Sequence, residues 1–524
     1  MFVVAVVAAR NKRGATRMGV GSIRKQLSAA PTQLRLDLIV IGSGLAARTA
    51  LEEVGRRGLD PASIAQITSG PASDNQQEAV GQFLTQAARA IHRRGVLSGR
   101  FLTGDDTKAD FPAVVQRARR LRELLATEDS SVRPAEGMMV LPGEARFLGG
   151  DRLEADGREI QFRRAILALT AEPVGAAIPG AEATGFLTPS DLLEQSTLPD
   201  RLALLGDGPE ACRWAQTVQR LGSQVHLFGS SPGLLPEEEP EAAEVVRRQL
   251  ADEGIQMHLG CEQLSLDRTG SQRSVVFQRG GRKEKLFVDR VLLVPDRRPN
   301  LTGLCLEAAG IATDDSHVVI GRQLYTSNRR VLAAGEICGR QFAAENVTRT
   351  MARRCVENAT GWRHRGFDPR LVSQGVWTDP QIVRVGLSQA EAAAAEVAID
   401  SNRVPLAELA PFAVEGRPEG FVLAHVRRAT GRVVGACVVA EDACDFIAPL
   451  VLLMARRLPL SVLGDLMLCR PSRSEAMESL AEQFGRGPQP SLWSLAGETW
   501  RIWRRRMRDL LHRRFARARQ NLLC

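Results

Sequence analysis

Short apolar runs followed by longer amphipathic stretches recur along the chain, a pattern typical of α/β proteins. The apolar run 38–41 is short enough for a buried strand, and apolar positions spaced three to four residues apart over residues 45–54 predict a helix. Gly42, Gly44 and Ala47 join the two segments at G-x-G-x-x-A spacing, with Ser43 in the turn. A strand, a glycine turn and a helix in this order form a dinucleotide-binding pattern, in which the helix N-terminus receives the pyrophosphate.

The same pattern recurs in the middle of the chain. The apolar run 202–205 leads into Gly206, Gly208 and Ala211 at the same spacing, and a helical stretch and a second apolar run follow. One such motif is weak evidence, but two in one chain predict two dinucleotides. We therefore expect an α/β protein with two Rossmann-like dinucleotide-binding domains.

The residues after the second strand of each unit bear on ribose binding, because an acid there bonds the ribose hydroxyls. The first unit has Thr68 and Ser69 at this place, and the second has Gly229, Ser230 and Ser231. We take Thr68, Ser69 and Ser230 as candidate ribose contacts in place of the missing acid. The second site leaves NAD and NADP open, with a slight preference for NADP because small hydroxyl residues leave room for a 2′-phosphate.

The remaining patterns predict further domains. Helical patterns cover residues 77–94 and 111–128, and short alternating segments between 138 and 169 predict an antiparallel insertion. A buried strand precedes Gly335 and Glu336, and after residue 368 the pattern changes to an α+β unit without glycine motifs. The expected divisions are a basic leader 1–33, a discontinuous first nucleotide domain 34–172 and 301–368, a second 173–300, an α+β domain 369–485, and a linker and tail 486–524.

Composition narrows the class of protein. The 524 residues are 44% hydrophobic and 25% charged, which is typical of a soluble globular protein. No apolar run reaches the roughly 18 residues of a membrane span. The nine cysteines show no C-x-x-C spacing, which argues against a metal site or a disulfide scaffold and favours a reducing cytoplasm.

The two ends of the chain are basic. Residues 1–33 contain no acidic residue. They are typical of a disordered leader, a transit peptide, or a start codon assigned too early. Most of the net charge of +9 lies in residues 501–519, and across residues 491–524 tryptophans and other apolar residues recur at helix-like spacing among the arginines. Such a basic amphipathic helix suits an anionic membrane surface, nucleic acid, or packing on a dimer. We expect a cytoplasmic protein without a specific nucleic-acid partner, with peripheral membrane contact as an alternative.

The order of these motifs resembles the class I pyridine nucleotide-disulfide oxidoreductases, such as dihydrolipoamide dehydrogenase, glutathione reductase, mercuric reductase and soluble pyridine nucleotide transhydrogenase. The resemblance rests on both glycine motifs and on residues 297–311, 326–336 and 377–387, with an echo at 430–436. It implies FAD at the first motif, with Gly335 and Glu336 beside it, and NAD or NADP at the second. It also implies a homodimer held by the C-terminal domain.

The chain departs from this family in its reactive groups. The family's cysteine pair should follow Ser69, but no cysteine precedes Cys212. Disulfide exchange needs a thiolate, so the family's usual route is excluded. Arg470 stands where the family has a histidine, and Glu475 follows at the position of the family's glutamate. Arginine keeps its proton and cannot act as a base. Arg470 could bind an anionic acceptor or pair with Glu475, and we favour the pairing.

Smaller departures affect cofactor contacts. Glu336 replaces the family's aspartate, Arg213 replaces a glutamate, and Cys469 is expected to be a buried apolar residue rather than a redox group. Two functions follow. The first is a flavoenzyme that passes electrons from NAD(P)H to a quinone, a second nicotinamide or oxygen. The alternative is a degenerate family member that acts as a nucleotide-binding or regulatory dimer.

Overall fold

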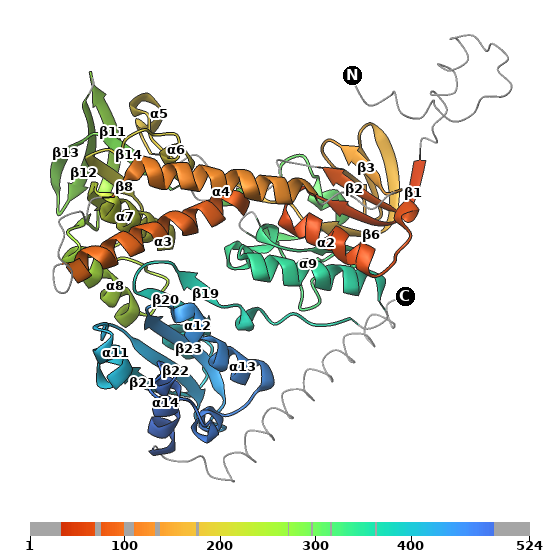
Figure 1. Cartoon of the computed structure of the whole chain (residues 1–524). Helices are drawn as coiled ribbons and strands as arrows, with labels where there is room; N and C mark the ends of the chain where they lie inside the picture. The colour runs from red at the N-terminus through yellow and green to blue at the C-terminus, as the bar shows by residue number, and fades with distance from the viewer. Residues whose placement is uncertain are drawn as a thin grey trace, which may run out of the picture.

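The computed structural model describes residues 33–68, 75–98, 109–131, 137–173, 178–270, 272–294, 297–314, 317–361 and 364–486, which form three lobes around two long helices (Figure 1). The expectations for the leader and for the tail 491–524 lie outside these residues. Within the described ranges, no helix combines the length and apolar composition needed to cross a membrane.

The first lobe is a seven-stranded sheet around the first glycine motif. Its parallel strands run in the order β3-β2-β1-β6-β18, and β5 and β4 add an antiparallel extension to β6. Helices α2 and α9 lie side by side on one face (Figure 1). The elements are β1 (Gln33–Ile41), α2 (Leu45–Arg56), β2 (Ile64–Thr68), β3 (Met139–Pro142), β4 (Arg146–Gly149), β5 (Arg152–Ala155), β6 (Arg158–Leu167), β18 (Val331–Ala333) and α9 (Glu345–Thr360).

The second lobe repeats the plan on a smaller scale. Four parallel strands run in the order β10-β9-β8-β14, and a three-stranded antiparallel sheet, β11-β12-β13, packs beside them. Strands β7 (Ala171–Pro173) and β15 (Arg297–Pro299) pair where the chain enters and leaves this lobe. The elements are α5 (Ala181–Thr184), α6 (Pro189–Leu192), β8 (Arg201–Leu205), α7 (Pro209–Leu221), β9 (Gln224–Phe228), α8 (Pro240–Asp252), β10 (Gln256–His258), β11 (Glu262–Thr269), β12 (Gln272–Arg279), β13 (Arg282–Val288) and β14 (Arg290–Leu293).

The third lobe is an antiparallel sheet of five strands, in the order β19-β20-β23-β22-β21, with helices packed against it. Strands and helices follow one another in this lobe without a glycine motif, as the sequence predicts. The division of the chain at particular residues stays a prediction. The elements are β19 (Gln374–Val376), β20 (Gln381–Gly386), α10 (Gln389–Ala394), β21 (Ile399–Pro405), α11 (Ala410–Val414), β22 (Phe421–Arg427), β23 (Val433–Ala440), α12 (Ala443–Phe446), α13 (Ala448–Arg456) and α14 (Glu475–Arg486).

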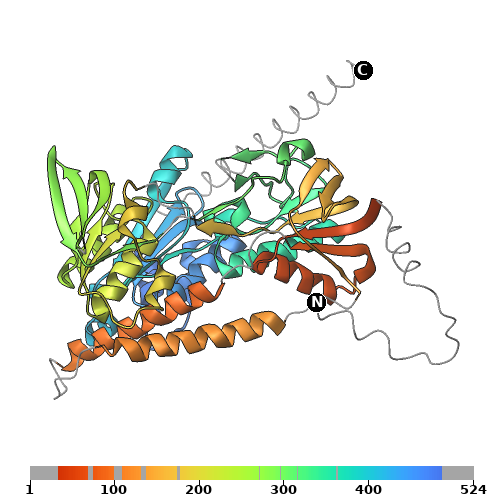
Figure 2. The same ribbon diagram turned by 90° about the horizontal axis from the view of Figure 1, so that it is seen from above.

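Helices α3 (Asn75–Ser98) and α4 (Phe111–Ser131) follow β2 in the sequence but pack elsewhere. Seen from above, both run along the side of the molecule towards the second lobe (Figure 2). Val80 and Leu84 of α3 share a buried cluster with Cys212 of α7 and Phe421 of β22. Helix α3 therefore joins the second and third lobes through its apolar face.

Buried ion pairs hold this junction. Arg89 of α3 contacts Glu441 at 2.7 Å and Asp442 at 2.8 Å. Arg220 of α7 contacts Asp379, which precedes β20, at 2.9 Å and Glu253, which follows α8, at 2.6 Å. Both arginine side chains are less than a tenth exposed. Because each buried charge has a partner, the network ties α3 and α7 to the third lobe.

Candidate functional site

The first glycine turn is held by backbone contacts on both sides. Gly42 has a φ of +136°, and its N–H donates to the carbonyl of Ile67 at 2.8 Å. A Cβ atom added at Gly42 would lie 2.2 Å from the carbonyl oxygen of Ala168. The buried side chain of Gln66 donates to the carbonyl of Gly42 at 2.9 Å. Sequence reasoning did not single out Gln66, because only the folded sheet brings its amide to the turn.

Helix α2 begins without a side-chain cap. Gly44 is its N-cap residue and makes no side-chain hydrogen bond to the first turn. Helix α10, by contrast, begins with a capping box between Ser388 and Glu391. The first turn of a helix has N–H groups without intrahelical partners, and these favour a bound phosphate. The turn Gly42–Gly44 therefore fits a dinucleotide diphosphate.

Gly335, which follows β18 in the sequence, lies beside the first turn of α2. Its φ is +85°, and a Cβ added there would lie 3.5 Å from the Cβ of Ala46 in α2. The neighbouring Glu336 accepts the N–H of Ala171 at 2.8 Å and lies 3.7 Å from the Nε of Arg297. The structure thus brings Gly335 to the first turn of α2, while the Glu336 carboxylate holds the pairing of β7 with β15.

Thr68 and Ser69 were predicted as ribose contacts. The hydroxyl of Thr68 donates to the carbonyl of Leu141 in β3 at 3.3 Å, which ties two neighbouring strands. Ser69 lies outside the described residues. The first site therefore keeps its diphosphate turn, and the Thr68 hydroxyl proton is used within the sheet.

The second glycine turn has the same backbone form with more space around it. Gly206 has a φ of +132°, and a Cβ there would lie 3.1 Å from the Cβ of Ala211. Gly208 is the N-cap of α7 without a side-chain cap, and a Cβ there would meet nothing within 4 Å. The loop containing Ser230 follows β9 at the same edge of the sheet. The three glycine-motif residues are thus placed around a helix N-terminus that fits a second diphosphate.

An acid between the two glycines also lies at this edge. The Oδ2 of Asp207 accepts the N–H of Ser231 at 2.8 Å, so the carboxylate lies beside the end of β9. Asp207 is not among the residues predicted from the sequence, because the ribose-binding acid is expected after β9 and not within the glycine turn. The signal was present as an acid in the middle of the G-x-G, a position where the motif itself requires no charge.

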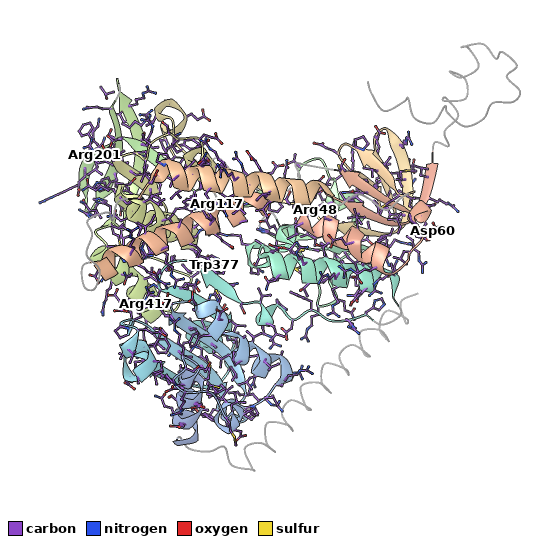
Figure 3. The ribbon with its side chains drawn as sticks, in the orientation of Figure 1. Arg48, Asp60, Arg117, Arg201, Trp377 and Arg417 are labelled. Carbon is purple, nitrogen blue, oxygen red and sulfur yellow. The ribbon has the colours of Figure 1, made fainter. Side chains whose placement is uncertain are left out.

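Arg213 is buried between α7 and α3. It pairs with Glu210, lies over the ring of Trp214 at 5.5 Å, and its Nη2 would lie 3.2 Å from a Cβ added at Gly81. A cavity of about 90 Å³ opens beside it. Figure 3 shows Trp377, which lines this cavity, between α3 and the sheet of the third lobe.

Within the described residues, no group of three or more His, Cys, Asp or Glu side chains is placed to hold a metal ion.

Burial makes most of the described thiols unreactive. It raises the pKa of Cys212 to about 12 and the pKa of Cys444 to about 11. Burial also raises the pKa of Cys338, Cys355 and Cys437 above the usual range. These groups are protonated near pH 7, and a protonated thiol is neither a good nucleophile nor a disulfide-exchange group.

Two expectations for the segment after α13 were wrong. Cys469 is exposed rather than buried, because the segment before α14 runs over the surface. Arg470 pairs with Glu478 and not with Glu475. The carboxylate of Glu475 instead accepts the N–H of Ser472 at 3.0 Å, which closes the loop that enters α14. Glu478 lies about one helical turn further on, where its carboxylate reaches Arg470.

Comparison with known proteins identifies the class of protein that this fold and these two turns define. The model of the pyridine nucleotide-disulphide oxidoreductases matches residues 36–359, and the model of their dimerisation domain matches residues 372–481. The chain belongs to the pyridine nucleotide-disulphide oxidoreductase family.

The chain is similar to curated relatives over most of its length. It is 28% identical over 455 residues to a mercuric reductase of Staphylococcus aureus, covering 86% of this chain and 82% of the reductase. It is 27% identical over 460 residues to a dihydrolipoyl dehydrogenase of Thermus scotoductus, covering 85% and 96% respectively.

Two solved structures share the fold. The flavoprotein disulfide reductase RclA of Escherichia coli gives a TM-score of 0.70 at 23% identity, covering 86% of this chain and 100% of RclA. LpdA of Mycobacterium tuberculosis gives a TM-score of 0.73 at 24% identity, covering 86% and 100%.

These findings confirm the predicted fold class, with two Rossmann-like domains and a C-terminal dimerisation domain. They also support an enzyme among the flavin-dependent oxidoreductases, a family whose members use FAD and NAD(P)H. The dimerisation domain supports a homodimer. Several large apolar side chains are exposed on that domain, and a group of them between residues 452 and 467 agrees with a surface that a second copy covers: Leu452, Leu458, Leu466 and Met467.

Proposed function

We propose that the protein is a flavin-dependent NAD(P)H oxidoreductase that delivers electrons to a small acceptor other than a disulfide: a quinone, a second nicotinamide or oxygen. One combination of observations supports this. Both dinucleotide turns keep their glycines and uncapped helices, while no cysteine precedes Cys212 in the sequence. These features support cofactor binding at both turns in a chain that has no cysteine where the family's pair should follow Ser69.

The chain's own part in this reaction is binding and orientation. The turn Gly42–Gly44 and the first turn of α2 would hold the FAD diphosphate, with Gly335 packed against them. The turn Gly206–Gly208 and the first turn of α7 would hold the nicotinamide dinucleotide. When bound, FAD would supply a group that takes up a hydride and gives up electrons, a role that no cysteine pair fills at the family's position in this chain. Arg470 keeps its proton and serves no base role.

A comparison of acceptors tests this proposal. We expect the purified protein to be yellow, and to oxidise NADH or NADPH steadily with dichlorophenolindophenol or a quinone. With lipoamide, glutathione disulfide or mercuric ion we expect less than about a hundredth of that rate, because disulfide exchange and mercury binding need thiolates. A colourless protein, or faster turnover with a disulfide than with the quinone, contradicts the proposal.

A thiol variant serves as the control for this comparison. Cys469 is the exposed cysteine among the described residues. If thiols carry no electrons, Cys469→Ser keeps the quinone rate within about twofold of the wild type. A loss of most of that rate in Cys469→Ser would assign the chemistry to this thiol and contradict the proposed route.

We further infer a cytoplasmic enzyme whose basic segment 491–524 contacts an anionic membrane. The proposal rests on sequence alone, because this segment lies outside the described residues. Arginines and tryptophans at helical spacing favour such a surface. Sedimentation with vesicles containing phosphatidylserine should be lost in a chain that ends at residue 490. Equal binding of both chains contradicts this inference.

A further inference from the structure

The carboxylate of Asp207 occupies a defined position in the second nucleotide domain. Its Oδ2 accepts the N–H of Ser231 at 2.8 Å, and its Oδ1 has no hydrogen-bond partner among the described residues. A Cβ added at Gly229 would lie 2.8 Å from the Cβ of Asp207. Gly229, at the end of β9, therefore leaves the space that the Asp207 side chain occupies. The Oδ1 of Asp207 remains available to a ligand.

The end of the second strand, beside which Asp207 lies, is where a Rossmann fold holds the adenosine ribose of a dinucleotide. In the Rossmann fold, the pyrophosphate lies at the first helix N-terminus and an acid at the end of the second strand bonds the ribose hydroxyls. Here Gly208 leaves the helix N-terminus open, and the second strand, β9, ends in Gly229, Ser230 and Ser231 without an acid. The Asp207 carboxylate reaches the same strand end from the neighbouring turn.

We propose that Asp207 serves as the ribose-binding acid of the second site and makes the enzyme select NADH over NADPH. The inference rests on the proposed function in one respect, namely that the second glycine turn binds a nicotinamide dinucleotide. It reverses the slight preference for NADP that the small residues after β9 suggest by themselves.

The charges around this edge agree with the assignment. A carboxylate accepts hydrogen bonds from a ribose diol and repels a 2′-phosphate. No lysine or arginine occurs in residues 229–239, where a 2′-phosphate would need a cation. Burial and the neighbouring His226 lower the pKa of His258 at the end of β10, and the charge of Arg279 adds a smaller effect in the same direction. Its guanidinium is paired with Glu284 at 3.4 Å.

Calorimetric binding of two nucleotide fragments to the purified holoenzyme tests the role of Asp207. The fragments are ADP-ribose and its 2′-phosphate, which differ only in the group that Asp207 would recognise. We expect the wild type to bind ADP-ribose at least about tenfold more tightly, the scale of one charged hydrogen bond. In Asp207→Asn this preference should fall to about threefold or less. Asparagine keeps an acceptor oxygen for the N–H of Ser231, so the turn is preserved.

A matched variant controls for the loss of one charge. Asp252 ends α8 on the surface of the same domain, and its side chain makes no ion pair or hydrogen bond with the described residues. Asp252→Asn should keep the wild-type preference, and both variants should keep the wild-type unfolding temperature within about 2 °C.

The possible outcomes separate this inference from the proposed function. A wild type that prefers the 2′-phosphate, or an Asp207→Asn variant with an unchanged preference, overturns the role of Asp207 while leaving a nucleotide site in place. Failure of the wild type to bind either fragment overturns both the role of Asp207 and the proposed nicotinamide site.

Discussion

The two glycine turns have nearly the same backbone conformation but different surroundings. Gly42 and Gly206 have φ values of +136° and +132°. An added Cβ at Gly42 meets the carbonyl oxygen of Ala168 at 2.2 Å, whereas at Gly206 the nearest atom is a methyl group at 3.1 Å. The carbonyl of buried Ala168, which directly follows β6, belongs to the backbone and cannot easily move aside, whereas a helix methyl group can shift slightly. The first turn is therefore the less tolerant of an added side chain.

The strand ends beside the turns differ as well. In the first unit, the hydroxyl of Thr68 donates to the neighbouring strand. In the second unit, Asp207 brings a carboxylate to the end of β9. The same local motif can thus be completed by different chemistry, and the surroundings decide which part of it meets the ligand.

The largest expected effect separates the two turns directly. Gly42→Ala should destabilise the protein by about 3–5 kcal/mol and remove most of the bound flavin, because the methyl group overlaps Ala168 and the φ is strained. Gly206→Ala should cost about 1–3 kcal/mol and leave the flavin in place. Denaturant unfolding and the flavin-to-protein ratio measure both effects. Equal flavin loss in the two variants would show that the turns are not distinct.

A second comparison concerns the arginine at the end of each motif helix. Arg220 of α7 is 4% exposed between Glu253 and Asp379, so Arg220→Met leaves two buried acids without a cation and should cost about 3–5 kcal/mol. Arg57, after α2, is 34% exposed beside Glu53, so Arg57→Met should cost less than about 1 kcal/mol. Both values follow from denaturant unfolding, and similar losses would contradict the buried junction.

The same junction should make the second unit sensitive to acid. Burial by itself would raise the pKa of Asp379, but Arg220 and Arg89 outweigh it and hold the pKa below its ordinary value of 3.8. The ionised carboxylate therefore adds stability above that ordinary value, and this stability is lost as the pH falls through the lower folded pKa. Unfolding temperatures measured down through this range should show the wild-type advantage over Asp379→Asn shrinking. A constant advantage would mean that Asp379 does not titrate there.

The smallest expected effect concerns Thr68. Its hydroxyl donates to Leu141 in the sheet, so Thr68→Val should cost about 1 kcal/mol of stability. Flavin affinity should stay within about twofold, since the hydroxyl proton is not offered to a ribose. A loss of flavin affinity of more than about tenfold, with stability unchanged, would restore Thr68 as a cofactor contact.

The fold could be predicted from the sequence because its strongest signals are local. A strand, two glycines and a helix with a small residue one turn in are read within about 15 residues, and the repeat at Gly206 adds a second unit. The path of α3 could not be read in this way. Its apolar face predicts a helix, but the choice of α7 and β22 as neighbours depends on the assembled domains.

The site could be predicted only where the motif itself specifies the residue. The glycines do so, since the turn requires their conformation. Gln66, Asp207 and Glu336 act through partners far away in the sequence or in a neighbouring loop, so their roles needed the structure. The pairing of Arg470 with Glu478 rather than Glu475 depends on where α14 begins, which sequence patterns locate least well.

The central claim is that flavin carries the electrons without a cysteine pair. Anaerobic titration of the yellow holoenzyme with NADH, followed in the visible spectrum, tests it most directly. A flavin and a disulfide together take up two electron pairs, whereas flavin alone takes up one. We predict complete bleaching of the flavin band at about one equivalent of NADH per flavin, with no new thiols detected afterwards. Uptake of about two equivalents, with new thiols appearing, would contradict the account.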